Sequence, residues 1–181
     1  MSLKEPNIIW ITGLSGAGKT TLGEIILKKL KGRKIPTIML DGDELRKILG
    51  VYNFNNLENH KLVKRIDIAL AYSRLCKYLS EQGFTIIIAT ISLYQKVHNW
   101  NKLNLKNYYE VYLEVPINEL KRRDPKGIYK RYDKGEIKNI AGLDLPIDEP
   151  EFPKWHFKFK DKMDFYEVAD IILNELYETN I

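Results

Sequence analysis

The chain has 181 residues, of which 44% are hydrophobic and 29% are charged. At about 150 residues per domain, this length predicts a single domain over residues 1–181, with a core large enough to fold without disulfides or metal. The composition excludes disordered and collagen-like chains and disulfide scaffolds. The one cysteine, Cys76, cannot form an internal disulfide, which fits a reducing compartment.

Lysine and arginine outnumber the acidic residues by 29 to 24, a formal net charge of +5. A basic excess is found in nucleic-acid-binding proteins, but also in enzymes of phosphorylated small molecules, and we favour the second class. No apolar run approaches the ~20 residues of a membrane span, and the first six residues contain no apolar signal core. We therefore expect a cytoplasmic protein without a nucleic-acid or membrane partner.

Short apolar segments alternate with longer segments of helical periodicity along the chain. Strands are predicted at residues 7–12, 37–40, 84–90 and 109–115, and helices at residues 19–31, 61–82, 95–106 and 164–177. A further helix is expected after Pro116, and alternation over 155–159 is typical of a short half-buried strand. This order predicts an α/β fold with a mostly parallel central sheet covered by helices on both faces.

Residues 13–20, Gly-Leu-Ser-Gly-Ala-Gly-Lys-Thr, match the pattern G-x-x-x-x-G-K-[ST] between a predicted strand and a predicted helix. In such a loop, backbone N–H groups and the helix dipole face a phosphate. Lys19 would lie between the β- and γ-phosphates of ATP, and the Thr20 hydroxyl would bind Mg²⁺. The predicted ATP-binding residues here are Gly13, Ser15, Gly16, Ala17, Gly18, Lys19, Thr20 and Thr21.

A phosphate loop alone does not separate kinases from guanine-nucleotide switches and motor ATPases. The sequence nearest to a guanine-binding Asn-Lys-x-Asp element, residues 101–104, lacks the aspartate. Strand 84–90 continues into Ile91 and Ser92, without the acidic residue that a motor ATPase places beside its phosphate-loop strand. These observations favour a kinase.

Two carboxylates, Asp41 and Asp43, follow the predicted strand 37–40. The carboxyl ends of parallel strands gather around the ligand crevice, where such a pair can orient Mg²⁺ and accept a proton from an incoming hydroxyl. The alternative is a helix N-cap, because the sequence from Asp43 to Arg46 resembles a helix start. We favour catalysis for at least one of the two.

The basic segment 122–138 is poor in apolar residues. It suits a lid that closes over nucleotide phosphates and excludes water, with Arg123 contacting ATP. The alternative is a solvated surface helix.

Several blocks, in order along the chain, resemble the adenylylsulfate (APS) kinase family: residues 13–21, 40–46, 91–94, 123–130, 135–138 and 142–144. The resemblance implies a P-loop kinase fold and transfer of the ATP γ-phosphate to the ribose 3′-hydroxyl of APS, with a homodimer as the family habit. It also implies roles for individual residues. Asp41 would serve the metal, Asp43 the acceptor hydroxyl, Arg46 and Lys138 the acceptor nucleotide, and Ser92 corresponds to a serine traditionally marked as a phosphoserine site.

The departures from the family pattern cluster on the acceptor side. Leu70 and Ala71 stand where the family has two arginines, and residues 95–98 lose two more. Ile140 replaces an aromatic residue that stacks on the acceptor adenine. Tyr52, Phe54, Arg65 and Arg74 are candidate substitutes. The alternatives are therefore a kinase of another conjugate, such as the cytidine diphosphoramidate of the family's capsule-cluster branch, or a non-catalytic nucleotide-binding module.

The remaining candidates favour structural roles. His60, His98 and His156 share no metal-ligand spacing. Cys76 is expected in the core, and Trp100 either in the core or in the acceptor pocket.

Overall fold

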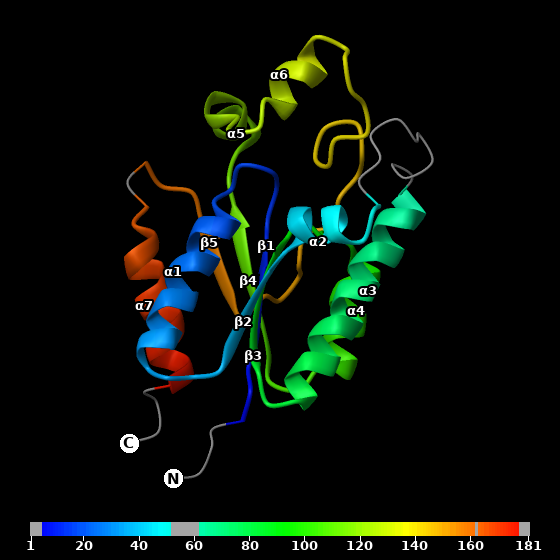
Figure 1. Cartoon of the computed structure of the whole chain (residues 1–181). Coiled ribbons are helices and arrows are strands. Elements are labelled where there is room, and N and C mark those ends of the chain that lie inside the picture. Colours follow the sequence, from blue (N-terminus) through cyan, green and yellow to red (C-terminus); the bar gives the residue numbers. More distant parts are fainter. Residues whose placement is uncertain (1–4, 52–61, 162, 178–181) are drawn as a thin grey trace.

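The computed structural model describes residues 5–51, 62–161 and 163–177. One sheet runs through it in the order β2-β3-β1-β4-β5, and all its pairings are parallel (Figure 1). The strands are β1 (Ile8–Thr12), β2 (Thr37–Asp41), β3 (Thr85–Thr90), β4 (Tyr108–Glu114) and β5 (Trp155–Lys158). The helices are α1 (Lys19–Gly32), α2 (Gly42–Ile48), α3 (Leu62–Glu81), α4 (Gln95–Asn104), α5 (Ile117–Arg123), α6 (Ile128–Asp133) and α7 (Phe165–Tyr177).

Strand β1 lies in the centre of the sheet, and all five of its residues are buried. Both of its faces are covered by helices, which is why its sequence is continuously apolar instead of alternating. Ile9 and Ile11 pack on one face of the sheet, whereas Ile8 and Trp10 pack on the other. The predicted α/β fold with helices on both faces is confirmed.

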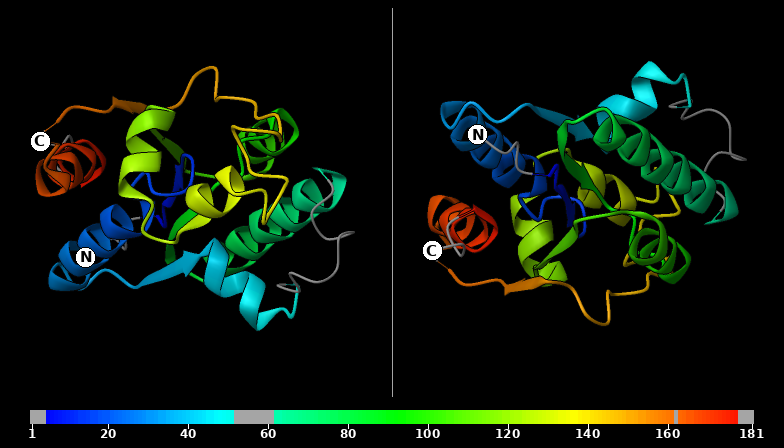
Figure 2. Two further views of the ribbon diagram at one scale, coloured as in Figure 1. Left: turned by 90° about the horizontal axis from the view of Figure 1, so that it is seen from above. Right: turned by 90° about the horizontal axis from the view of Figure 1, so that it is seen from below.

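The two faces of the sheet have separate hydrophobic cores, and different helices cover each face (Figure 2). Helices α1 and α7 cover one face with apolar stripes that include Leu22 and Ile172. Helices α3 and α4 cover the other face, where Cys76 and Val97 are completely buried. The core position predicted for Cys76 is confirmed, and burial raises the pKa of its thiol to about 12.

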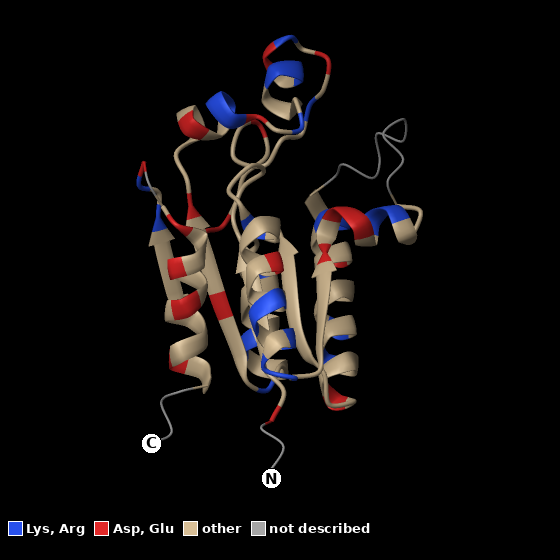
Figure 3. Ribbon diagram, turned by 60° about the vertical axis from the view of Figure 1, so that its left-hand side comes forward, with Lys and Arg blue, Asp and Glu red and all other residues tan. Residues whose placement is uncertain are grey.

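The carboxyl ends of the strands meet at one edge of the sheet, and both ends of the described chain lie at the other (Figure 1). Helices α5 and α6 stand above the carboxyl edge and contribute much of the predicted basic segment (Figure 3). A loop then runs down from α6 to β5. Within the described ranges, no helix combines the length and apolarity needed to cross a membrane.

Most predicted elements lie within two residues of the observed ones. Two short helices had been weighed only as alternatives: α2 begins directly after Asp41, and α6 lies inside the segment 122–138 that we expected to be a lid. The half-buried strand expected around residues 155–159 is β5. Trp100 packs against the core cluster of α3 and α4 and does not line the cavity at the carboxyl edge. Tyr52, Phe54 and His60 fall outside the described residues.

Candidate active site

A cavity of about 1090 Å³ opens at the carboxyl edge of the sheet, between the phosphate loop, α2, α3 and the lid. This volume exceeds what one drug-sized ligand needs and is suited to two bound molecules. Nearly all of the predicted site residues line it: Ser15, Gly16, Gly18, Lys19, Thr20, Thr21, Asp41, Asp43, Arg46, Ser92, Arg123 and Lys138. Gly13 and Ala17 are buried beneath the loop and do not line the cavity.

The phosphate loop connects β1 to α1 and depends on its glycines. Gly13 has φ 150°, and a Cβ there would lie 2.6 Å from the carbonyl oxygen of Leu113. Gly18 has φ 96° and would place a Cβ 2.3 Å from the ring of Phe165. Both the left-handed backbone and the lack of space require glycine at these positions. Phe165, at the start of α7, is a cavity residue that the sequence analysis did not identify.

Lys19 is the first residue of α1, and its ammonium donates a 2.8 Å hydrogen bond to the carbonyl oxygen of Leu14. Burial first, and then repulsion by the nearby Lys126, lower the pKa of Lys19 to about 7. A group of anionic phosphates beside this ammonium would favour its charged form. The loop is therefore electrostatically prepared for an anionic ligand.

Proton uptake should accompany Mg-ATP binding. At pH 8 a group with a pKa of about 7 is mostly neutral, so restoring its ordinary pKa of 10.5 takes up roughly nine tenths of a proton. Calorimetry in two buffers with different ionisation enthalpies measures this number directly. The Lys19→Arg variant is the control, because arginine stays charged throughout and should show almost no uptake. Equal uptake by both proteins would contradict the assignment to Lys19.

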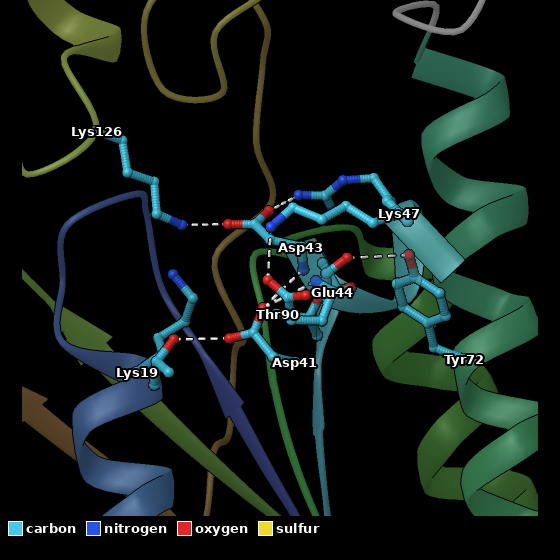
Figure 4. A network of polar contacts seen from close by, with 12 residues as sticks. Lys19, Asp41, Asp43, Glu44, Lys47, Tyr72, Thr90 and Lys126 are labelled. Atoms are coloured by element: carbon cyan, nitrogen blue, oxygen red, sulfur yellow. Dashed lines mark hydrogen bonds and ion pairs between the residues drawn. The ribbon is translucent and has the colours of Figure 1, made fainter. Parts of the chain in front are cut away.

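Asp41 ends β2 and has two roles within the structure (Figure 4). Its Oδ1 accepts hydrogen bonds from the backbone N–H groups of Asp43 (2.8 Å) and Glu44 (3.3 Å), so it is the N-cap of α2. Its Oδ2 accepts a 2.7 Å hydrogen bond from the hydroxyl of Thr20. The sequence analysis weighed a helix start at Asp43; the helix instead begins at Gly42, which leaves Asp43 free of the capping role.

The residues around Thr20 fit the binding of Mg²⁺ through a nucleotide. A hydroxyl and a carboxylate oxygen lie side by side, and such hard oxygen ligands suit this ion. In the described part of the chain, no cluster of three or more His, Cys, Asp or Glu could hold a metal by itself. Mg²⁺ is usually held by one or two protein groups together with substrate phosphates, which matches this donor set.

Asp43 lies in the first turn of α2 and forms ion pairs on both carboxylate oxygens. Arg46, one turn further along α2, pairs with Oδ1, and Lys126 of the lid pairs with Oδ2. In Figure 4, Lys19 and Lys126 point into the space beside the two carboxylates. Lys126 lies in the block 123–130 that carries the family resemblance, but the sequence analysis did not name it as a site residue. Its position opposite Asp43, 83 residues away, appears only in the fold.

The lid is attached to the phosphate loop. The Tyr129 hydroxyl donates a 2.9 Å hydrogen bond to the carbonyl oxygen of Ser15. The carboxylate of Asp124 accepts from the N–H groups of Tyr129 and Lys130 at the start of α6. Arg123 pairs with Glu119, and its guanidinium lies 4.8 Å from the ring centroid of Phe159. The lid and surface-helix interpretations are compatible, because α6 is a helix placed over the cavity.

The other half of the cavity, away from the phosphate loop, contains Ser92 and Arg65. Ser92 is only 4% exposed, has φ 28°, and its hydroxyl lies 2.9 Å from that of Thr90. Arg65 of α3 lines the cavity and donates a 2.8 Å hydrogen bond to the carbonyl oxygen of Asn139. Arg74 does not line it; this exposed guanidinium lies over the Trp100 ring. Of the substitutes proposed from the sequence, Arg65 alone among the described residues reaches the cavity.

The comparisons with known proteins agree with this geometry. The family model described as adenylylsulphate kinase matches residues 5–158. A cytidine diphosphoramidate kinase of Campylobacter jejuni is 44% identical over 146 residues, covering 81% of this chain and 82% of the relative. An adenylyl-sulfate kinase of Clostridium acetobutylicum is 38% identical over 148 residues, covering 81% of this chain and 72% of the relative.

Among solved structures, a Mycobacterium tuberculosis APS kinase in complex with AMPPNP and APS superposes with a TM-score of 0.84 at 25% identity. The match covers 95% of this chain and 98% of that one.

Proposed function

This chain belongs to the adenylylsulphate kinase family, and from that premise we propose that it transfers the γ-phosphate of Mg-ATP to a ribose hydroxyl of a cytidine nucleotide conjugate such as cytidine diphosphoramidate. The family and its relatives make the chain a kinase of a nucleotide conjugate. The identity of the acceptor is our inference. We also propose that residues 1–181 form one domain, that the protein is cytoplasmic, and that it forms a homodimer.

The cavity supplies a group for each part of the transfer. Lys19 stabilises the charge on the β- and γ-phosphates, and Thr20 with Asp41 holds Mg²⁺. The ion, when bound, neutralises phosphate charge. The oxygen of the acceptor hydroxyl forms a bond to the γ-phosphorus, while the bond between that phosphorus and the ADP oxygen breaks. Asp43 accepts the proton that the hydroxyl loses. Arg46, already paired with Asp43, is placed to contact the same nucleotide.

The lid excludes water during this step. Lys126 closes the entrance opposite Asp43, while Arg123 lies beside the ATP half of the cavity. Without such closure a P-loop kinase would hydrolyse ATP. We assign Lys138 to the acceptor nucleotide. An in-line transfer needs no covalent intermediate, so a phosphoserine at residue 92 is not required. We therefore assign Ser92 a hydrogen-bonding role near the acceptor.

The observation that carries the cytidine assignment is made within the described residues: the loop wall at residues 139–141 presents no aromatic ring to the cavity. Ile140 lines the cavity there, at the position where the resemblance to APS kinases implies an aromatic ring. Leu70, which stands at a family arginine position, is buried in the core under α3 and cannot reach an anionic acceptor. Stacking is worth about 1–3 kcal/mol per base, so its loss weakens adenine recognition.

APS is the second candidate, and Arg65 is the observation in its favour. This guanidinium lies in the acceptor half of the cavity and suits a planar anionic group. The deciding measurement is acceptor-dependent formation of ADP from Mg-ATP, with APS and cytidine diphosphoramidate tested side by side. Stimulation by the cytidine conjugate supports the proposal, and stimulation by APS alone contradicts it. Slow hydrolysis that no acceptor stimulates would indicate a binding module.

Restoring an aromatic ring should shift the acceptor preference. In Ile140→Phe, we expect kcat/KM for APS to rise about 10-fold because the ring can stack on adenine, while KM for ATP stays constant. The control is Ile137→Phe, which adds the same ring elsewhere on the cavity wall. An equal gain in both variants, or none in Ile140→Phe, would show that residue 140 does not read the base.

A further inference from the structure

A buried hydrogen-bonded network lies beneath the acceptor half of the cavity, outside the groups used above. His98 of α4 is completely buried, and Glu110 of β4 is 2% exposed. The Nδ1 of His98 lies 2.6 Å from Oε1 of Glu110, and the same oxygen accepts a 3.0 Å hydrogen bond from the Tyr108 hydroxyl. Two ionisable side chains at this depth are expensive to bury, and an apolar pair could fill the same volume.

The second ring nitrogen of His98 contacts a loop that is distant in the sequence. Its Nε2 lies 3.3 Å from the carbonyl oxygen of Asp148, which belongs to the loop between α6 and β5. Asp148 makes two more bonds to the same region. Its N–H donates to the carbonyl oxygen of Leu93 (2.9 Å), and its Oδ2 accepts from the N–H of Gln95 (2.9 Å). This residue therefore anchors its loop to the segment 93–98.

The anchored loop carries the wall of the acceptor pocket. Asn139 and Ile140 donate their N–H groups to the carboxylate of Asp144 at 2.8 and 2.6 Å, and residues 140–145 are closed by further backbone hydrogen bonds. Residues 139–145 are thus held rigid by their own hydrogen bonds, so their position depends on the attachment at Asp148. At the other end of the same contact, Leu93 directly follows Ser92. The attachment at Asp148 therefore fixes the loop 139–148 relative to Ser92, and these two segments form two walls of the acceptor pocket.

We propose that His98 is a positioning residue for the acceptor, holding the loop 139–148 against the Ser92 turn through the carbonyl of Asp148. The carboxyl group of Glu110 orients the ring through its contact with Nδ1, so that an Nε2–H can donate to the carbonyl oxygen of Asp148. Glu110 therefore serves the acceptor site through His98. The ATP half is built from the phosphate loop and Arg123, which the network does not touch.

The test uses variants that remove one contact at a time. His98→Asn keeps a donor near Glu110 but cannot reach Asp148, whereas His98→Gln places its amide N–H toward Asp148. Val97→Ala is the control, a truncation at an equally buried neighbour on α4 that leaves the attachment intact. We expect His98→Asn to lower kcat/KM for the acceptor between about 10-fold and 100-fold at unchanged KM for ATP, and His98→Gln to recover much of it.

Glu110→Leu provides a second route that leaves His98 in place. Leucine has no polar atom to hold the Nδ1 of His98, so the ring is no longer oriented toward Asp148 and the same selective loss should follow. This variant decides the matter if His98→Asn fails to fold. A loss in Val97→Ala as large as in His98→Asn, or a parallel rise in both KM values, would overturn the proposal and leave a structural role only.

The kinetic test depends on the proposed function, and a second readout does not. Hydrogen exchange of the amides in residues 139–148 needs no substrate. Exchange should quicken in His98→Asn and Glu110→Leu relative to Val97→Ala, and unchanged exchange would contradict the attachment. If the wild-type protein turns over no acceptor, the proposed function fails while this result still stands or falls by itself.

Discussion

Asp43→Asn is expected to lower kcat by about 1000-fold while KM for ATP changes less than about 3-fold. The amide keeps the shape of the carboxylate and can still bond to Arg46 or Lys126, the two partners of Asp43. It cannot accept the proton of the acceptor hydroxyl. The loss should therefore appear in the chemical step, and single-turnover kinetics with saturating acceptor separates that step from binding and release.

Glu44→Gln is the matched control for this prediction. Glu44 is the next acidic residue of α2, is exposed, and pairs with Lys47 away from the cavity lining. Its change alters the charge of the helix by the same amount, so kcat should stay within about 2-fold of the wild type. A kcat for Asp43→Asn within 10-fold of the wild type would reject Asp43 as the proton acceptor and leave it a positioning role.

Lys19→Ala is expected to reduce kcat/KM by at least about 1000-fold, the largest loss of any single lysine variant in the phosphate loop and lid. No other lysine of α1 lines the cavity, and Lys126 of the lid is paired with Asp43. Lys28→Ala, an exposed change on the same helix, should be nearly silent. Retention of a tenth of the wild-type activity in Lys19→Ala would contradict the kinase assignment.

The stability of this variant separates lost chemistry from lost folding. Burial lowers the pKa of Lys19 to about 7 from 10.5, so between these values the unfolded chain binds more protons than the folded one. The stability contributed by this residue therefore rises with pH in that window, and its charged form opposes folding of the ligand-free protein. The Tm of Lys19→Ala at pH 7.5 should equal or exceed that of the wild type, which thermal unfolding measures.

The amino-acid sequence by itself determined the elements and the phosphate loop. Continuous apolar runs such as residues 8–11 predict buried parallel strands, and the helical periodicity of residues 62–81 predicts a helix, because both signals are local. The loop 13–20 is recognisable for the same reason. Its glycines, lysine and threonine act on one ligand from consecutive positions, so their spacing is preserved in the sequence.

The tertiary structure alone decided which distant residues meet at the site. Lys126 faces Asp43, Phe165 covers Gly18, and His98 reaches Asp148; none of these pairs has a periodic or motif signal. Each depends on the order of the strands and on the packing of helices across them, which sum many weak contacts over the whole chain. The phosphate-binding half could therefore be predicted from the sequence, whereas the acceptor half, lined by α3 and by the loops around Ser92 and Ile140, required the fold.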